Sequence, residues 1–82
     1  MRILDLGCGI EKVYGAVGLD NASLPGVDIV HDLLDIPYPI KNESFEKIYL
    51  RHVIEHFYLN DFEKILNECF RILTSDGVLQ IT

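Results

Sequence analysis

The chain has 82 residues, of which 49% are hydrophobic, so it is long enough for one domain with a modest core. Its net charge is −6 with only seven Lys and Arg residues, which argues against binding to a nucleic-acid duplex or to an anionic membrane surface. No apolar segment approaches the roughly 20 residues that a membrane-spanning helix needs.

The N-terminus and the cysteines predict a cytoplasmic protein. Asp5 interrupts the first apolar run and no cleavage-site pattern follows it, so we expect no signal peptide. The two cysteines, Cys8 and Cys69, lack the spacing of metal ligands and are predicted to be free thiols.

The first predicted element is a buried strand over Ile3–Leu6 that runs into a glycine turn at residues 7–9. Because glycine has no Cβ, a ligand can approach the backbone of this turn closely. A second strand, predicted over residues 16–19, leads to Asp20. A carboxylate at that place can accept hydrogen bonds from two neighbouring hydroxyls, as on a ribose. Together these features predict a nucleoside-binding site at the carboxyl ends of adjacent parallel strands.

The same glycines do not match the phosphate-binding motifs. The dinucleotide motif G-x-G-x-x-G needs a third glycine where this chain has Lys12, and its acid follows about 20 residues on. Asp20 follows Gly9 by only eleven residues, and no Gly-Lys-Ser/Thr sequence of a P-loop follows the turn. The pattern therefore favours a nucleoside ligand without phosphate groups.

Two further strands and their loops are predicted in the middle of the chain. In chain order we expect a turn over residues 21–26, a strand over 27–31, a loop over 35–44, a strand over 45–50, and a loop or short helix over 51–58. Pro37 and Pro39 bar regular structure from the loop. Asp32 directly follows the third strand and Arg51 the fourth.

Residues 60–73 form the best predicted helix. Asn60 is predicted to be its N-cap, because Glu63 three residues later completes a pattern like a capping box. Hydrophobic residues recur at steps of three and four and predict one apolar face: Phe62, Ile65, Leu66, Cys69, Phe70 and Leu73. Glu68 and Arg71 belong to the opposite, polar face. A turn over residues 74–77 and a fifth strand over 78–82 are predicted to follow.

Strands that alternate with crossover connections predict a doubly wound, mostly parallel α/β sheet of about five strands, with residues 1–82 as a single domain. Sheets of this kind bind ligands beyond the carboxyl ends of their strands. We therefore expect Asp5, Asp20, Asp32 and Arg51, each at the end of a predicted strand, to gather along one edge of the sheet.

Six segments, in this order, resemble motifs of the class I S-adenosylmethionine-dependent methyltransferases, and of the type 11-like members in particular, which have a Rossmann-like fold. The segments are Ile3-Leu4-Asp5-Leu6-Gly7-Cys8-Gly9, Gly18-Leu19-Asp20, residues 31–38 with an Asp-x-x-x-x-Pro pattern, residues 44–49 starting Ser-Phe-Glu, Val53-Ile54-Glu55-His56, and Arg71-Ile72-Leu73 before a turn with glycine. The resemblance implies S-adenosylmethionine as the cofactor. The last two strands of the family have no counterpart after the fifth strand, so we expect a partial, truncated domain.

The resemblance also implies roles for the residues of the first two strands. Gly7 and Gly9 would let the methionine part of the cofactor lie against the backbone. Asp5 would help to hold its ammonium group, directly or through water, and Asp20 would accept hydrogen bonds from both ribose hydroxyls. Acidic walls suit the positive charge of the sulfonium.

The later strands would complete the cofactor site. Asp32 would accept a hydrogen bond from the adenine amino group, the Leu33 amide would donate to the ring, and Arg51 would contact the methionine end or the substrate. The implied cofactor-binding residues are Asp5, Gly7, Cys8, Gly9, Asp20, Asp32, Leu33 and Arg51.

The implied reaction is an in-line displacement in which the acceptor attacks the methyl carbon of the sulfonium, and positioning supplies much of the catalysis. No residue is assigned as a general base, and the methyl acceptor is not identified. Residues 7–15 are too few for a crossover helix, so we expect a turn or a loop there. An exposed edge on the fifth strand predicts self-association.

Several alternatives compete with these interpretations. Residues 52–56 match the H-x-x-E-H zinc-peptidase motif, but no third ligand stands out in the 26 residues that follow, so a zinc site is disfavoured. Asp32 as a cap for the turn at residues 33–34 and Arg51 as a solvated side chain are the structural alternatives to ligand contact. A non-catalytic binding or partner subunit, and an inert fragment of a longer enzyme, stay open as alternative functions.

Overall fold

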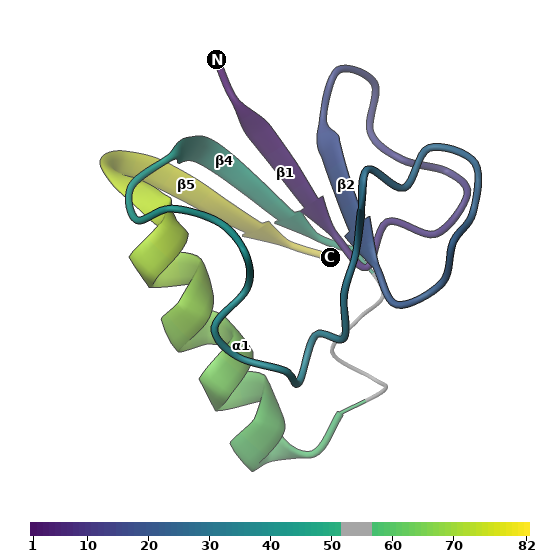
Figure 1. Ribbon diagram of the computed structural model, residues 1–82. Coiled ribbons are helices and arrows are strands. Elements are labelled where there is room, and N and C mark those ends of the chain that lie inside the picture. Colours follow the sequence, from purple (N-terminus) through teal and green to yellow (C-terminus); the bar gives the residue numbers. More distant parts are fainter. Residues whose placement is uncertain (52–56) are drawn as a thin grey trace.

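The computed structural model describes residues 1–51 and 57–82 as five parallel strands and a helix. The elements are β1 (Ile3–Leu6), β2 (Val17–Asp20), β3 (Ile29–Val30), β4 (Phe45–Leu50), α1 (Leu59–Ile72) and β5 (Leu73–Ile81). They form one sheet in the order β3-β2-β1-β4-β5 (Figure 1). The predicted parallel α/β fold is therefore confirmed, with β1 and β4 at the predicted residues.

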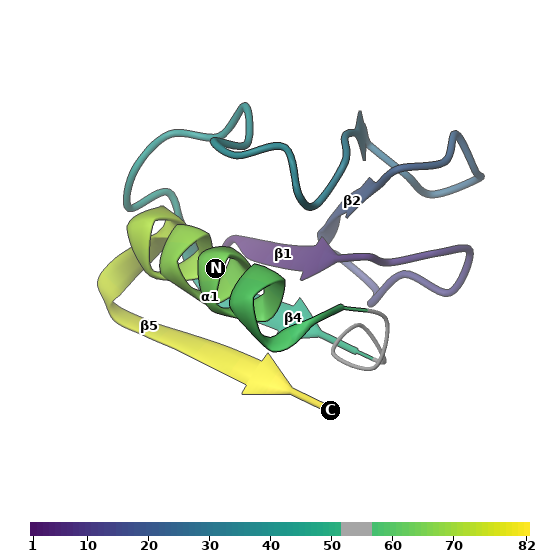
Figure 2. The ribbon, with the colours of Figure 1, turned by 90° about the horizontal axis from the view of Figure 1, so that it is seen from below.

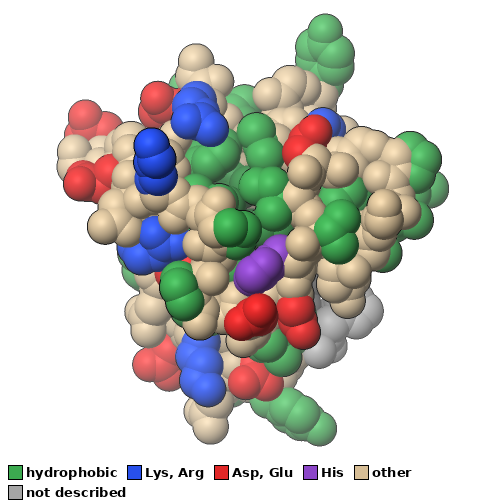
Figure 3. All heavy atoms as spheres, viewed as in Figure 1, with side chains coloured by type: hydrophobic (Ala, Val, Ile, Leu, Met, Phe, Trp, Pro, Cys, Tyr) green, Lys and Arg blue, Asp and Glu red, His purple; other side chains and the backbone are tan. Residues whose placement is uncertain are grey.

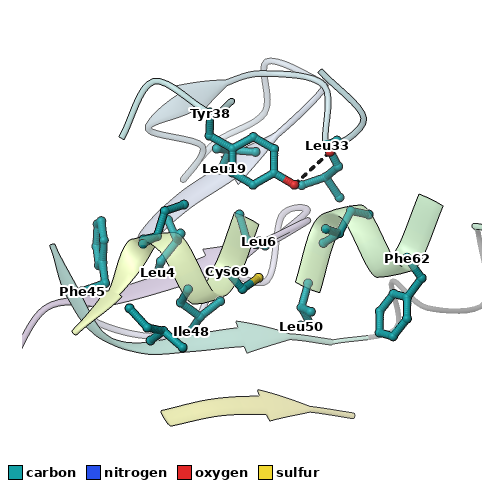
Figure 4. Packing of buried hydrophobic residues seen from close by; sticks show 13 residues of the cluster. Leu4, Leu6, Leu19, Leu33, Tyr38, Phe45, Ile48, Leu50, Phe62 and Cys69 are labelled. Carbon is teal, nitrogen blue, oxygen red and sulfur yellow. Dashed lines mark hydrogen bonds between the residues drawn. The ribbon is translucent and has the colours of Figure 1, made fainter. Parts of the chain in front are cut away.

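The hydrophobic core lies between the sheet and α1. Leu4 and Leu6 of β1 pair with Ile48 and Leu50 of β4, and Leu6 also pairs with Leu19 of β2. Because successive side chains of a strand point to opposite faces, these five residues share one face, and each is at most 1% exposed. Figure 4 shows them packed with Cys69 and Phe62 of the helix. Burial of a Leu or Ile side chain contributes about 1.5–3 kcal/mol, so this layer stabilises the sheet.

The start of α1 differs from the prediction. The helix begins at Leu59, with Tyr58 as its N-cap and no side-chain hydrogen bond from that cap. The Phe62 N–H already donates to the Tyr58 carbonyl at 2.9 Å, so the first turn closes before Asn60, which lies inside the helix. The predicted capping box at Asn60 and Glu63 is wrong because backbone bonding sets the helix start.

The predicted apolar face of α1 is correct at Phe62, Ile65 and Cys69, and wrong at Phe70. Phe70 is 61% exposed, whereas Glu68, assigned to the polar face, is only 4% exposed. The physical reason is a covering segment, residues 31–44, which packs over the side of α1 that carries Glu68 and supplies a hydrogen-bond donor to it, the Tyr38 N–H. Helical periodicity alone does not show which side such a segment covers.

The junction between α1 and β5 also differs from the prediction. The structure passes directly from the helix into β5 at Leu73, whereas a turn and a strand starting at Val78 are predicted. The pairing register jumps from Phe45↔Leu73 to Lys47↔Val78, so residues 74–77 lie opposite Glu46 alone. The predicted turn is thus present as an irregularity within the strand.

The connections between the strands are mostly irregular. Residues 7–16 contain no helix, as predicted from their short length, and residues 31–44 contain only turns and bends. The second strand lies one residue later than predicted, and the third strand is reduced to Ile29–Val30. Within residues 1–51 and 57–82, no helix is long and apolar enough to cross a membrane.

The two faces of the sheet are covered unequally. Figure 2 shows α1 and residues 31–44 on the same side, and no helix of the described residues on the other. The pairings Ile3↔Lys47 and Lys47↔Val78 place these side chains on the second face, where Val78 is 55% exposed. Figure 3 views the covered side, where hydrophobic side chains gather near the middle and charged ones lie mainly around them.

The edge strand β5 predicts contact between copies of this chain. β5 is at the edge of the sheet that the described residues form, and an edge strand offers unpaired backbone groups to another chain, so we propose that this 82-residue chain self-associates at high concentration. Ile81 is 46% exposed near the end of β5, and Ile81→Lys should shift the population toward monomer because a charge opposes edge pairing. Sedimentation velocity over a concentration series measures both, and a monomer mass at every concentration would contradict the prediction.

Candidate functional site

A cavity of about 510 Å³ opens at the carboxyl ends of the strands, within the size range of small-molecule sites. Seven of the eight predicted site residues line it: Gly7, Cys8, Gly9, Asp20, Asp32, Leu33 and Arg51. The remaining lining residues, which the sequence interpretation missed, are Ile10, Glu11, Asn21 and Phe57. The structure therefore brings strand-end residues from β1, β2 and β4, with the residues after β3, into one pocket.

The glycine turn after β1 forms one wall of this pocket. Gly7 and Gly9 have φ angles of 68° and 59°, a left-handed conformation that favours glycine. The Gly7 N–H donates to the Leu19 carbonyl at 2.7 Å, which fixes the turn against β2. Apart from its two chain neighbours, no residue within 1–51 and 57–82 has an atom within 4 Å of a Cβ built on Gly9, so this side of its backbone is open to a ligand.

Asp20 lies directly beside the glycine turn, as the positions of the two strand ends predict. Its Oδ2 accepts a hydrogen bond from the Gly9 N–H at 2.8 Å, and its Oδ1 accepts one from the Ala22 N–H at 3.2 Å. An ionised carboxylate has about four lone-pair sites, so two acceptor positions are left over. The carboxylate can therefore bind a pair of hydroxyl donors while it still holds the turn.

Asp32 and Leu33, which follow β3, form a second wall of the pocket. Asp32 Oδ1 accepts a hydrogen bond from the Leu34 N–H at 2.9 Å, so the residue does cap the turn that follows it. It also lines the cavity, so capping and ligand contact are compatible. Leu33 is 7% exposed, and its carbonyl accepts a hydrogen bond from the Tyr38 hydroxyl at 2.8 Å (Figure 4).

Asp5 is the predicted site residue that does not line the cavity. Its side chain is fully buried, and Oδ2 accepts hydrogen bonds from the Val13 N–H at 2.9 Å and from Arg51 Nη2 at 2.8 Å. Arg51 Nη2 also donates to the Glu11 carbonyl. Asp5 thus ties the loop after the glycine turn to the cationic side chain at the end of β4.

Two atoms of this ion pair lack hydrogen-bond partners in the part of the chain that the structure describes. Asp5 Oδ1 and Arg51 Nε are buried and make no hydrogen bond within residues 1–51 and 57–82. Buried polar groups are normally paired, so these two atoms mark a polar contact that residues 1–51 and 57–82 do not satisfy.

The charges around the pocket favour a cationic ligand. Glu11, Asp20 and Asp32 bring three carboxylates to its lining, whereas the charge of Arg51 is offset by Asp5. A concave site lined by one sign of charge attracts the opposite sign.

Cys8 has a packing role in the pocket wall. Burial, followed by the negative charges of Asp5 and Asp20, raises the pKa of the Cys8 thiol above its usual value, which keeps it neutral near pH 7. A Cβ on Gly18 would lie 2.7 Å from Cys8 Sγ, so the sulfur packs over the backbone of β2.

The zinc-motif alternative, with His52, Glu55 and His56, lies outside the described residues. Among the residues that the structure describes, no group of three His, Cys, Asp or Glu side chains is arranged to hold a metal ion.

Comparison with a known structure supports the fold over nearly all of the chain. A solved SAM-dependent methyltransferase from Leishmania major superposes with a TM-score of 0.81 over 98% of this chain, at 16% sequence identity. The match covers 41% of that protein, so this chain spans less than half of its length. A search of curated proteins gave no match.

A family comparison agrees with that superposition. The model of the methyltransferase domain family matches residues 21–81. The glycine turn and Asp20 lie just before the matched range, so their place in the pocket is an observation separate from the match. Because the match spans well over half of the chain, the protein belongs to the methyltransferase domain family.

Proposed function

We propose that this chain is the cofactor-binding part of an S-adenosylmethionine-dependent methyltransferase that acts on an acceptor yet to be identified. The observation that carries the proposal is the hydrogen bond between Gly9 and Asp20 at the wall of the cavity. It places an open backbone and a carboxylate with acceptor capacity side by side, which is the arrangement that an adenosyl group requires.

The residues around the cavity fit the cofactor chemically. Asp20 would accept hydrogen bonds from the ribose hydroxyls, and the open backbone at Gly9 would lie along the methionine part. Asp32 would accept from the adenine amino group, and the Leu33 amide would donate to the ring. The acidic lining suits the positive charge of a sulfonium.

Asp5 acts at this site through Arg51. With Asp5 fully buried and bonded to Arg51, the guanidinium is oriented at the end of β4, where it would contact the carboxylate of the methionine part. Asp5 does not line the cavity, so it would act on the neighbouring ammonium group only indirectly.

The chemistry would depend mainly on positioning. When bound, S-adenosylmethionine supplies an electrophilic methyl group, and the acceptor's nucleophile displaces the thioether in line. The chain's own residues would fix the ribose and the base so that the methyl group points at the acceptor. We assign no general base.

Isothermal titration calorimetry with S-adenosylmethionine and S-adenosylhomocysteine tests the proposal. We expect dissociation constants in the micromolar range for both ligands and no measurable binding of ATP, because the glycine turn lacks the third glycine of a pyrophosphate motif. Absence of heat with both ligands, from protein with a folded circular dichroism spectrum, would overturn it and leave a non-catalytic relative or an inert fragment.

A further inference from the structure

A buried ion pair on α1, between Glu68 and Arg71, also makes hydrogen bonds to the segment that covers the helix. Glu68 is 4% exposed, and its carboxylate accepts two hydrogen bonds from Arg71, one from Nε and one from Nη2, both at 2.7 Å. Glu68 Oε2 also accepts the Tyr38 N–H at 2.6 Å. Burial of a carboxylate lowers the free energy of unfolding unless the carboxylate is paired and hydrogen-bonded. The N–H of Tyr38 supplies one of these hydrogen bonds, so the buried pair is stable only while the backbone of residue 38 lies close to it.

Arg71 extends the connection along the same segment. Its Nη1 donates to the Ile40 carbonyl and to Asn42 Oδ1, each at 2.8 Å, and its Nη2 reaches the Tyr38 carbonyl at 3.3 Å. One guanidinium therefore holds residues 38–42 against the helix. Residues 31–44 have no regular secondary structure, so these side-chain bonds take the place of a backbone ladder.

Tyr38 carries this anchoring to the pocket. Its side chain is 2% exposed, and its hydroxyl donates to the Leu33 carbonyl at 2.8 Å (Figure 4). Burial raises the pKa of the Tyr38 hydroxyl, so it stays a donor across the neutral range. Leu33 lines the cavity, and a chain of contacts thus runs from α1 through Tyr38 to the pocket wall.

We propose that Tyr38 is a positioning residue for the wall that binds the adenine base, held in place by Glu68 and Arg71. The inference rests on the proposed function, since it assigns the base to the side of the pocket formed by Asp32 and Leu33. Tyr38 does not line the cavity, so it acts on the ligand through Leu33.

Tyr38→Phe tests the inference because it removes the hydroxyl and keeps the ring. We expect affinity for S-adenosylhomocysteine and for 5′-methylthioadenosine to fall by about five- to tenfold, the effect of one buried hydrogen bond. Preference for methylthioadenosine over methylthioinosine, which lacks the amino group, should shrink by a similar factor. Tyr49→Phe on β4 is the matched control, because Tyr49 lies outside the cavity lining, and it should bind like the wild type.

Two further measurements separate positioning from folding. Amide hydrogen exchange at Leu34, whose N–H donates to Asp32, should become about tenfold faster in ligand-free Tyr38→Phe and stay unchanged in Tyr49→Phe. Arg71→Lys keeps a cation beside Glu68 but loses the fork that reaches residues 38–42. Arg71→Lys should show the same loss of base preference, and it takes the place of Tyr38→Phe in the test if Tyr38→Phe fails to fold.

The measurements distinguish failure of the proposed function from failure of the role assigned to Tyr38. If the wild type binds neither ligand, the proposed function fails and the inference fails with it. If the wild type binds and the folded variants keep both its affinity and its base preference, the inference alone is overturned.

Discussion

Asp20→Ala is expected to weaken the binding of S-adenosylhomocysteine by about 100-fold or more. Hydrogen bonds to a charged group contribute about 1.5–3 kcal/mol each, and two ribose hydroxyls would lose theirs together. The substitution also removes the acceptor for the Gly9 N–H, so the glycine turn loses its connection to the end of β2. Calorimetry should therefore detect no binding at ligand concentrations that saturate the wild type.

Two control variants make this result specific. Asp28 accepts the Gly18 N–H at 2.8 Å but lies outside the cavity lining, so Asp28→Ala should retain wild-type affinity. Asp20→Asn keeps an oxygen for the Gly9 N–H but lacks the charge, and it should fall between the wild type and Asp20→Ala. Wild-type affinity in folded Asp20→Ala would refute the ribose role.

Arg71→Leu is expected to lower the free energy of unfolding by about 3 kcal/mol. The substitution leaves Glu68, which is 4% exposed, as a buried carboxylate without its cation, and removal of one partner of a buried pair costs about 3–5 kcal/mol. The lower end applies because the Arg71 side chain is 28% exposed. Urea unfolding followed by circular dichroism measures the loss, and a change below about 1 kcal/mol would contradict it.

The same pair makes the stability depend on pH. The hydrogen bonds from Arg71, followed by that from the Tyr38 N–H, lower the pKa of Glu68 in the folded state against the opposing effect of burial. A carboxyl whose pKa is lower when folded stabilises the protein above its unfolded pKa of about 4.3, and that stabilisation is lost as the pH falls through the folded pKa.

Glu68→Gln should therefore flatten the decline in unfolding free energy below about pH 5, since its side chain does not titrate. Glu63→Gln, at an exposed position of α1, should leave the decline unchanged. Parallel pH profiles for the wild type and Glu68→Gln would argue against a role for this carboxyl in acid unfolding.

The sheet and half of the pocket follow from local sequence patterns. β1 and β4 are short apolar runs with clear boundaries, and the glycines and Asp20 come directly after buried strands. Because parallel strands end at the same edge, their residues can be placed together without knowledge of the loops.

The remaining site features depend on contacts between distant residues. Asp5 is buried because Arg51, 46 positions later, pairs with it, and Phe57 reaches the pocket without a local motif. Glu68 is buried because a segment 30 positions earlier supplies a donor. Periodicity describes one element at a time, so it cannot show which loop covers a helix or which cation reaches a carboxylate.

The two walls of the pocket belong to different layers of the fold. The glycine turn and Asp20 continue the sheet, whereas Leu33 is held through Tyr38 by the helix. A ligand that contacts both walls would therefore connect the sheet to the helix layer. Its binding free energy would then stabilise both layers together. Amide hydrogens of α1, as well as those of residues in contact with the ligand, would be protected from exchange.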